Sequence, residues 1–373
     1  MIKKFLVLCL CVILSGCSLK NDKTTIIKFS TWGSASEIAI IKPIITEFER
    51  NNPNVKIELI HIPQDYFQKL HLLFASNLAP DVIFINNLNL PIYSNYLEDL
   101  SKDINQNNFY PKALEALSYN NKIYAIPRDI STLMIYYNKT LFKKYNVPFP
   151  NENWTLDEMI LTANKFKNTS VYGISYEPLL YYTMPYIYYY GGGVLSKNGT
   201  NISNNTNSQL GINTYKNMAY KYHIAPVPSQ IGSKTLAQMF LDGQIAMHLS
   251  GRWLVPKYRE CAKFDWDIVN FPKYSVPCDA SGWAVSKSSK HKDIAIKFVL
   301  FLSNKQNIDK MTRDGLIVPA RIDIATSKTF NSNMPAHSYL FLKTAQKAIV
   351  PTISKDYNNL TDRINDEIFN TKN

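Results

Sequence analysis

The chain has 373 residues, a formal net charge of +12 at pH 7 and 46% hydrophobic residues. This length is enough for two domains of ordinary size, each with its own core. A basic protein can favour anionic surfaces or substrates, but no run of Lys and Arg here exceeds two residues and the basic side chains are dispersed. The charge therefore does not indicate a nucleic-acid-binding protein.

The first seventeen residues have the pattern of a lipoprotein signal peptide. Lys3 and Lys4 precede an uncharged apolar stretch over 5–14, which as a helix would rise only ~15 Å and could not span a bilayer. Small residues and Cys17 follow directly. We predict removal of residues 1–16, a lipid on Cys17 that anchors the chain on the outer side of a bacterial membrane, and a polar tether over 17–25. An ordinary signal peptide that contains cysteine is the alternative.

Two cysteines remain once the signal peptide and Cys17 are set aside, namely Cys261 and Cys278. Outside the cytoplasm they could form a disulfide. It would close a loop of about 17 residues and contribute roughly 3 kcal/mol on the chain-entropy model. Two free cysteines are the competing expectation. No further apolar run approaches the ~20 residues of a transmembrane helix.

Short apolar strands and amphipathic helices alternate from residue 26 onward. The first part is predicted to contain strands over 26–29, 55–61 and 82–85 and helices over 36–49 and 66–77. Three strands and two helices within sixty residues indicate an open α/β sheet.

The pattern continues through the middle of the chain. Strands are expected over 123–126, 133–137, 172–175, 245–249 and 283–285, and helices over 156–166, 236–241 and 294–302, with only helices after Pro335. A polar turn, Pro127-Arg128-Asp129, is expected between the first two of these strands. Thr155 and Glu158 have the spacing of a capping box. Neither a repeat nor a Gly/Ser linker divides the chain, so strands are expected to cross the domain boundary.

Four segments together resemble bacterial extracellular solute-binding proteins of family 1, the sugar- and glycerol-3-phosphate-binding proteins of ABC importers. They are "IIKFSTWGSASE", "LHLLFASNLAPDVIFIN", the long segment "KIYAIPRDISTLMIYYNKTLFKKYNVPFPNENWTLDEM", and the set "FLDGQIAMHLSGRWL", "SGWAVSKSSKHKDIAIKFVLFL" and "GLIVPAR". The third is the most specific. The resemblance covers nearly all of residues 26–350, whereas the tail after Pro351 is short and lacks the tryptophan of many sugar binders.

The resemblance implies an α/β periplasmic-binding-protein type II fold, with two α/β lobes around a ligand cleft and two or three hinge crossings. Carried over to this sequence, the first lobe takes residues 26–128 and 283–318, and the second takes 132–280 and 322–373. The crossings fall near Asp129, Gly282 and Pro319. The family also implies a monomeric, non-catalytic receptor that closes on a solute and delivers it to a membrane permease, with no metal or cofactor.

A sugar site needs flat aromatic faces and hydrogen-bonding groups at strand ends, which line the crevice of open α/β sheets. The candidate ligand-binding residues are Trp32, Glu37, Asn86, Asp129, Ser131, Tyr189, Gly192, Gly251, Arg252, Trp253, Gly282, Trp283 and Arg321. Each also has a structural interpretation: the tryptophans could be core residues, Glu37 could complement a helix N-terminus, and Arg252 could pair with a carboxylate.

The tyrosine-rich segment over 181–193, "YYTMPYIYYYGGG", could stack on sugars or hold ferric iron. Tyr189 and Gly192 are the members expected to reach the cleft, while the other tyrosines pack.

A carbohydrate is the expected ligand, and a phosphorylated polyol bound by Arg252 and Arg321 is the alternative. An extracellular glycoside hydrolase or a surface adhesin is a more distant reading. The chain has no HExxH or GxSxG motif, its six histidines are scattered, and paired catalytic carboxylates would meet only in the fold.

Overall fold

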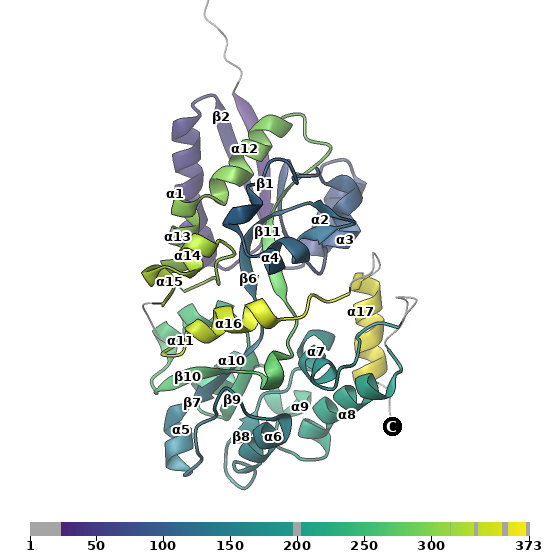
Figure 1. Cartoon of the computed structure of the whole chain (residues 1–373), viewed down its shortest axis with the longest axis vertical. Helices are drawn as coiled ribbons and strands as arrows, with labels where there is room; N and C mark the ends of the chain where they lie inside the picture. Colours follow the sequence, from purple (N-terminus) through teal and green to yellow (C-terminus); the bar gives the residue numbers. More distant parts are fainter. Residues whose placement is uncertain (1–23, 197–202, 314, 332–334, 353–356, 371–373) are drawn as a thin grey trace, which may run out of the picture.

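The computed structural model describes residues 24–196, 203–313, 315–331, 335–352 and 357–370. The signal peptide, Cys17 and the tether up to residue 23 lie outside this range. The described chain folds into two α/β lobes, one above the other in Figure 1. Among the described helices, none is both long enough and apolar enough to cross a membrane.

The first lobe contains a five-stranded mixed sheet. Its order is β2 (Val55–His61), β1 (Thr25–Thr31), β3 (Val82–Asn86), β11 (Asp279–Val285) and β6 (Ile126–Ser131). The first three strands are parallel, whereas β11 runs antiparallel to β3 and β6. Strand β3 is an uninterrupted apolar run because helices cover both faces of a parallel sheet.

The helices of this lobe come from both ends of the chain. They are α1 (Ala35–Asn51), α2 (Tyr66–Ala75), α3 (Leu90–Tyr93), α4 (Pro111–Ala116), α12 (Lys292–Leu302), α13 (Lys305–Arg313), α14 (Ile322–Ala325) and α15 (Lys328–Asn331), beside a small hairpin of β4 (Ser118–Tyr119) and β5 (Lys122–Ile123). Helix α1 packs against α12 and α13, far later in the sequence. The aromatic rings of Phe48 and Phe298 join them, with centroids 4.9 Å apart.

The second lobe contains a four-stranded sheet in the order β10 (Trp266–Asn270), β7 (Met134–Asn138), β9 (Ile245–Ser250) and β8 (Tyr172–Ile174). Its helices are α5 (Lys139–Lys144), α6 (Leu156–Asn164), α7 (Leu180–Tyr189), α8 (Thr206–Tyr220), α9 (Pro228–Ile231), α10 (Leu236–Leu241), α11 (Val255–Cys261), α16 (Tyr339–Lys347) and α17 (Tyr357–Asn365). Helix α16 lies along the top of this lobe in Figure 1, at the junction with the first lobe.

Three segments connect the lobes, and they lie side by side. Strand β6 leads into β7, β11 returns from β10, and the chain around Pro319 forms a bridge with Asp129 of β6. Helices α14 and α15 pack against α13 of the first lobe, although residues after 322 are predicted to belong to the second. Phe330 of α15 also lies against Arg252 of the second lobe, so α15 contacts both lobes.

The predicted elements mostly form where the pattern places them. Helix α1, strand β2, strand β3 and helix α10 follow their predicted ranges within three residues. The capping box of Thr155 and Glu158 is present at the start of α6. The predicted polar turn Pro127–Asp129 is wrong, because these residues lie inside the fully buried strand β6. Pairing with β11 holds this polar stretch extended.

Of the two possibilities left open for the cysteines, a disulfide or two free thiols, the structure has the free thiols. Cys261 is exposed near the end of α11, and Cys278 is buried just before β11, both as free thiols. Burial, followed by the nearby Asp279 carboxyl, raises the pKa of Cys278 well above its ordinary value. The thiol therefore stays protonated and packs as a small apolar group.

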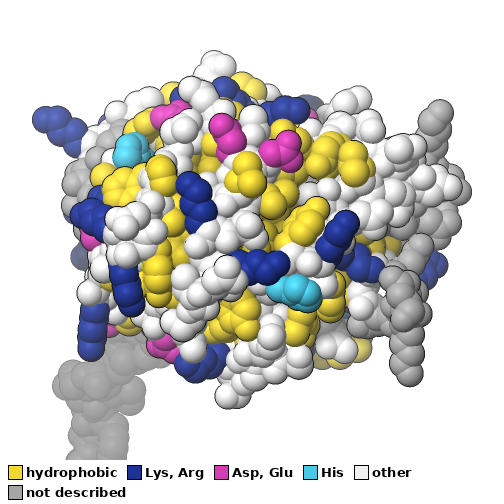
Figure 2. Space-filling model, turned by 90° about the horizontal axis from the view of Figure 1, so that it is seen from below, with side chains coloured by type: hydrophobic (Ala, Val, Ile, Leu, Met, Phe, Trp, Pro, Cys, Tyr) yellow, Lys and Arg dark blue, Asp and Glu magenta, His cyan; other side chains and the backbone are white. Residues whose placement is uncertain are grey.

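The basic residues are dispersed on the face at the end of the second lobe. Figure 2 views the molecule from the end of the second lobe, where Lys and Arg side chains are scattered among apolar and uncharged groups. This face has no continuous basic surface of the kind that follows a nucleic-acid backbone.

Burial of a histidine in the second lobe makes stability depend on pH. His248 in β9 is buried and lies 2.5 Å from the Tyr258 hydroxyl. Burial, with a smaller contribution from Lys257, lowers its pKa from 6.5 to about 3. Between these values the unfolded chain binds a proton that the folded chain does not, so the free energy of unfolding falls as pH falls.

We expect His248→Gln to remove part of this acid sensitivity. One proton that only the unfolded chain binds lowers the free energy of unfolding by about 1.4 kcal/mol for each pH unit below the unfolded pKa. Gln binds no proton in this pH range, so the variant lacks this loss. Urea unfolding from pH 7 to pH 4.5 measures the slope for both proteins. His71→Gln, on the exposed surface of α2, is the matched control and should leave the slope unchanged. An unchanged slope in His248→Gln would contradict the assignment.

Candidate functional site

A cavity of about 450 Å³ opens where the two lobes meet at the hinge strands. This is the size range of small-molecule sites. Its walls are Trp32, Glu37, Pro63, Tyr66, Phe67, Asn86, Arg128, Asp129, Ser131, Trp253, Asp279, Ser281, Leu316, Ile317 and Val318. Six of the thirteen predicted ligand-binding residues are among them: Trp32, Glu37, Asn86, Asp129, Ser131 and Trp253.

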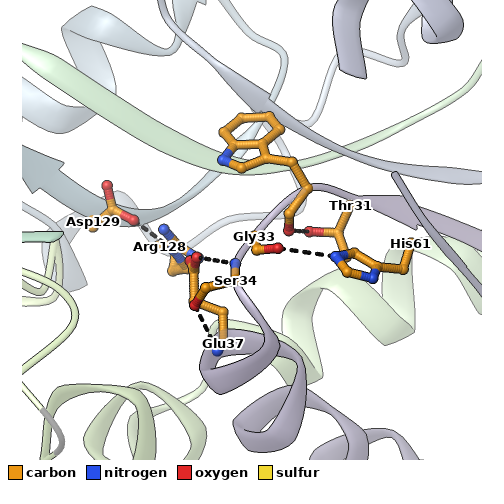
Figure 3. Close-up of polar contacts among 8 residues, drawn as sticks. Thr31, Gly33, Ser34, Glu37, His61, Arg128 and Asp129 are labelled. Carbon is orange, nitrogen blue, oxygen red and sulfur yellow. Dashed lines mark hydrogen bonds and ion pairs between the residues drawn. The ribbon is translucent and has the colours of Figure 1, made fainter. Parts of the chain in front are cut away.

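The turn after β1 places two of these residues. Gly33 has φ of +131°, a conformation that other residues rarely adopt, and a Cβ there would lie 3.0 Å from the Glu37 carboxylate. Ser34 then caps α1: its amide donates to Glu37 Oε2 over 2.9 Å, and its hydroxyl accepts from the Glu37 amide. Figure 3 shows Glu37 turned toward Arg128 as well. Glu37 therefore both caps the helix and faces the cavity.

Aromatic side chains form one wall of the cavity. The ring of Trp32 lies 4.2 Å from that of Phe84, 4.9 Å from Tyr66 and 5.3 Å from Phe67, measured between centroids. These contacts hold the half-buried indole in place, so it presents a fixed apolar surface.

A bulge in β6 brings two consecutive charged residues to the same cavity. Neighbouring residues of a strand normally point to opposite faces. Here Ser281 pairs with Asp129 and Gly282 with Pro127, so the pairing skips Arg128. A Cβ at Gly282 would lie 2.3 Å from the Ile126 carbonyl oxygen, so this close approach requires glycine.

Arg128 joins the charged groups of the cavity. Its Nε donates to Asp129, its Nη1 lies 3.5 Å from Glu37 Oε1 (Figure 3), and its guanidinium lies 4.3 Å from the Phe84 ring centroid. Burial lowers the pKa of Arg128, but the two carboxylates raise it by more, so it stays charged. Burial likewise raises the pKa of Asp129, partly offset by Arg128.

Asp279 adds a further carboxyl group at the start of β11. The Tyr181 hydroxyl donates to its Oδ2 over a long 3.5 Å. Burial first, and the charge of Asp129 second, raise its pKa from 3.8 to about 7.

The second lobe contributes Trp253, which is 38% exposed although it is a large aromatic side chain. Its ring lies directly over the backbone of Gly251, where a Cβ would be 1.9 Å from the ring. The Tyr136 hydroxyl donates to the Gly251 carbonyl over 2.7 Å and holds this turn. Gly251 thus supports the indole from behind and does not line the cavity itself.

Four other predicted binding residues have structural roles. Trp283 is 1% exposed and lies in the core next to Phe84, and Gly282 forms the close strand contact described above.

Arg252 is buried between the rings of Phe330 and Phe341, and burial lowers its pKa to about 9. Arg321 forms a two-pronged ion pair with Asp323.

Neither residue of the tyrosine-rich segment that was expected to reach the cleft lines the cavity. Tyr189 accepts a hydrogen bond from the Leu156 amide and lies under Lys273, and Gly192 packs against the start of α8. Tyr181, the second residue of α7, donates a hydrogen bond to Asp279, which does line the cavity. Among the described residues no group of three or more His, Cys, Asp or Glu could hold a metal ion.

Sequence reasoning missed Arg128, Asp279, Tyr66 and Phe67. Tyr66 and Phe67 start a helix whose apolar spacing indicates core packing, and Asp279 precedes an apolar strand. Arg128 could have been suggested by its position next to the predicted Asp129. In a regular strand, however, neighbouring side chains point to opposite faces, so Arg128 would have been placed away from the cavity.

Comparison with known proteins decides the family. The family described as bacterial extracellular solute-binding protein matches residues 43–336, well over half of the chain. The chain belongs to this family. Its members are non-catalytic receptors that bind a solute.

Curated relatives and solved structures agree on the family and the fold. The maltodextrin-binding protein MdxE of Bacillus subtilis is 27% identical over 300 residues, 75% of this chain and 70% of the relative. A galactooligosaccharide-binding protein of the same species is 24% identical over 311 residues, 78% and 72% of the two chains. The ABC substrate-binding protein Lmo0181 of Listeria monocytogenes, solved with cycloalternan, superposes with a TM-score of 0.84, 25% identity and 92% coverage of both chains.

We expect Gly251→Ala to weaken ligand binding without unfolding this solute-binding protein. The added Cβ displaces the Trp253 ring, which can rotate into the open cavity at little cost to the core. Affinity for the best oligosaccharide in a binding screen should fall about tenfold, the equivalent of 1.4 kcal/mol, by titration calorimetry. Gly193→Ala, where a Cβ meets only one atom at 3.7 Å, is the control. Unchanged affinity in Gly251→Ala would show that the orientation of Trp253 does not matter.

Proposed function

We propose that this solute-binding protein captures a neutral oligosaccharide between its lobes and delivers it to the permease of an ABC importer. The observation that carries the proposal is the half-exposed ring of Trp253 in the second lobe, which lines the same cavity as Trp32 of the first lobe. Pyranose rings have apolar C–H faces, and two indoles from different lobes can hold such a ring from both sides.

Hydrogen-bonding groups around the aromatic wall support a hydroxylated ligand. The Ser131 hydroxyl lines the cavity, is buried and has no hydrogen-bond partner among the described residues. A buried hydroxyl without a partner is costly, and a sugar hydroxyl would satisfy it. Glu37, Asp129 and Asn86 offer acceptor oxygens nearby.

The relatives support the same ligand class. The two Bacillus proteins are named for binding maltodextrin and galactooligosaccharide, and the Listeria protein was solved in complex with cycloalternan. These relatives bind different sugars. They therefore support an oligosaccharide as the ligand of this chain, but they do not indicate which one.

A phosphorylated polyol is less well supported. It was considered because Arg252 and Arg321 could grip a phosphate. Arg252 lies between two phenyl rings, Arg321 is paired with Asp323, and neither lines the cavity. The guanidinium that does line it, Arg128, is already paired with two carboxylates.

Capture requires that the ligand favour the closed arrangement of the lobes. A ligand that touches both lobes binds the closed state more tightly than the open one and shifts the population toward it. Here Trp32 and Glu37 belong to the first lobe, Trp253 to the second, and Asp129 and Ser131 to the hinge strand. The closed form would then present both lobes to the permease.

A thermal-shift screen of residues 17–373 with Cys17→Ser tests the proposal. We expect a neutral oligosaccharide among maltotriose, lactose and cellotriose to stabilise the protein. At a ligand concentration of 100 times the dissociation constant, binding adds about 2.7 kcal/mol to the free energy of unfolding. Trp253→Ala should lose at least about tenfold in affinity.

Tyr96→Ala is the matched control, since Tyr96 is an exposed aromatic residue outside the cavity. Stabilisation by glycerol 3-phosphate and by no neutral sugar would contradict the proposal. Equal affinity of the wild type and Trp253→Ala would contradict the assigned role of the indole.

We further propose that a lipid on Cys17 anchors the protein to the outer face of a bacterial membrane. The signal-peptide pattern supports this anchor, and a Streptococcus pneumoniae relative, 25% identical over 194 residues, bears the name maltooligosaccharide ABC transporter solute-binding lipoprotein. In cells fed radiolabelled palmitate, the full chain should take up label and partition with membranes. Cys17→Ser should do neither, whereas Cys261→Ser should behave as wild type. Label on Cys17→Ser would overturn the assignment.

A further inference from the structure

The cavity contains more negative than positive charge, although the whole chain has a net charge of +12. Its walls carry three carboxyl groups, those of Glu37, Asp129 and Asp279, and one guanidinium, that of Arg128. Arg128 is in contact with Glu37 and Asp129. The third carboxyl group is therefore left without a contacting cation in the described structure.

Asp279 is well placed to meet a ligand. It begins β11 opposite Ser131 of β6, so it lies at the hinge end of the cavity beside the unpartnered Ser131 hydroxyl. The contact from Tyr181, 3.5 Å long, satisfies it only weakly.

We propose that Asp279 determines the charge specificity of the cleft, admitting neutral saccharides and refusing acidic ones such as aldonates, uronates and sugar phosphates. The inference rests on the proposed oligosaccharide function and adds a specificity rule to it. A neutral sugar donates hydroxyl hydrogens to the carboxylate. An anionic ligand would bury a second negative charge beside it, and like charges close together in a desolvated site repel strongly.

The groups that face Asp279 set the pH range of this effect. They are Arg128 and Asp129 on β6, Tyr181 and Tyr182 on α7, and the neighbouring thiol of Cys278. Burial and Asp129 place the pKa of Asp279 at about 7. Above this pH the carboxyl is negative and repels an acid, whereas below it the carboxylic acid is neutral and the repulsion fades.

Maltotriitol and maltotrionate provide a matched pair of probes, because they share one open-chain skeleton and differ in a terminal hydroxymethyl or carboxylate. Calorimetry on the mature chain at about pH 8 should show at least tenfold weaker binding of maltotrionate. At about pH 6 the difference should shrink, although the probe stays ionised. Asp279→Asn should bind both probes similarly at both pH values.

Asp103→Asn removes the same charge from an exposed site in the first lobe and should keep the wild-type discrimination. Equal binding of the two probes by the wild type at pH 8 would overturn the inference while leaving the oligosaccharide function standing. Discrimination that persists in Asp279→Asn would also overturn it. Failure of maltotriitol and of every neutral sugar in the screen to bind would overturn the proposed function, and this inference with it.

Discussion

The pairing of β6 with β11 is the constraint on which the site depends. These two strands belong to the first-lobe sheet and also carry the chain between the lobes. The third connecting segment joins them through the bridge between Asp129 and Pro319. Because all three crossings are adjacent, the lobes share one narrow hinge, and the residues on it lie at the bottom of the cleft. Asp129, Ser131, Asp279 and Ser281 reach the cavity in this way.

The bulge in this pairing concentrates charge where the lobes meet. It turns Arg128 and Asp129 toward the same space, and Glu37 joins them from the start of α1. A buried charge is tolerated only when it is paired and hydrogen-bonded. The Arg128 cluster satisfies that requirement for three groups. Asp279 stays outside it, and burial together with the charge of Asp129 raises its pKa.

The two lobes contribute differently to the cleft. The first lobe supplies a packed aromatic wall in which Trp32 is held by Phe84, Tyr66 and Phe67. The second lobe supplies a single indole, that of Trp253, which lies on the backbone of Gly251. Among the described residues, no other aromatic ring of the second lobe packs against it. Such an arrangement fits the proposed closure on a ligand, in which the ligand would supply the packing partner of Trp253.

Much of the fold and part of the site could be predicted from the sequence. Periodicity located α1, β2, β3 and α10, because a buried face must repeat with the period of its element. Residues at strand ends, such as Trp32, Asn86 and Trp253, were found because the ends of strands line the cleft of an open sheet.

Only the tertiary structure decided which way the side chains near these strand ends point. Trp283 is buried in the core and Trp253 is exposed, although a glycine lies within two residues before each, because Trp283 lies within the sheet and Trp253 on a turn beyond the end of a strand. Arg252 is buried against α15 and α16, which come more than seventy residues later. Arg128 faces the cavity through a bulge that depends on pairing with β11, about 150 residues away. The sequence by itself determined the periodic elements and the family, because local patterns encode them. Contacts between distant segments decided which charges and rings line the cavity.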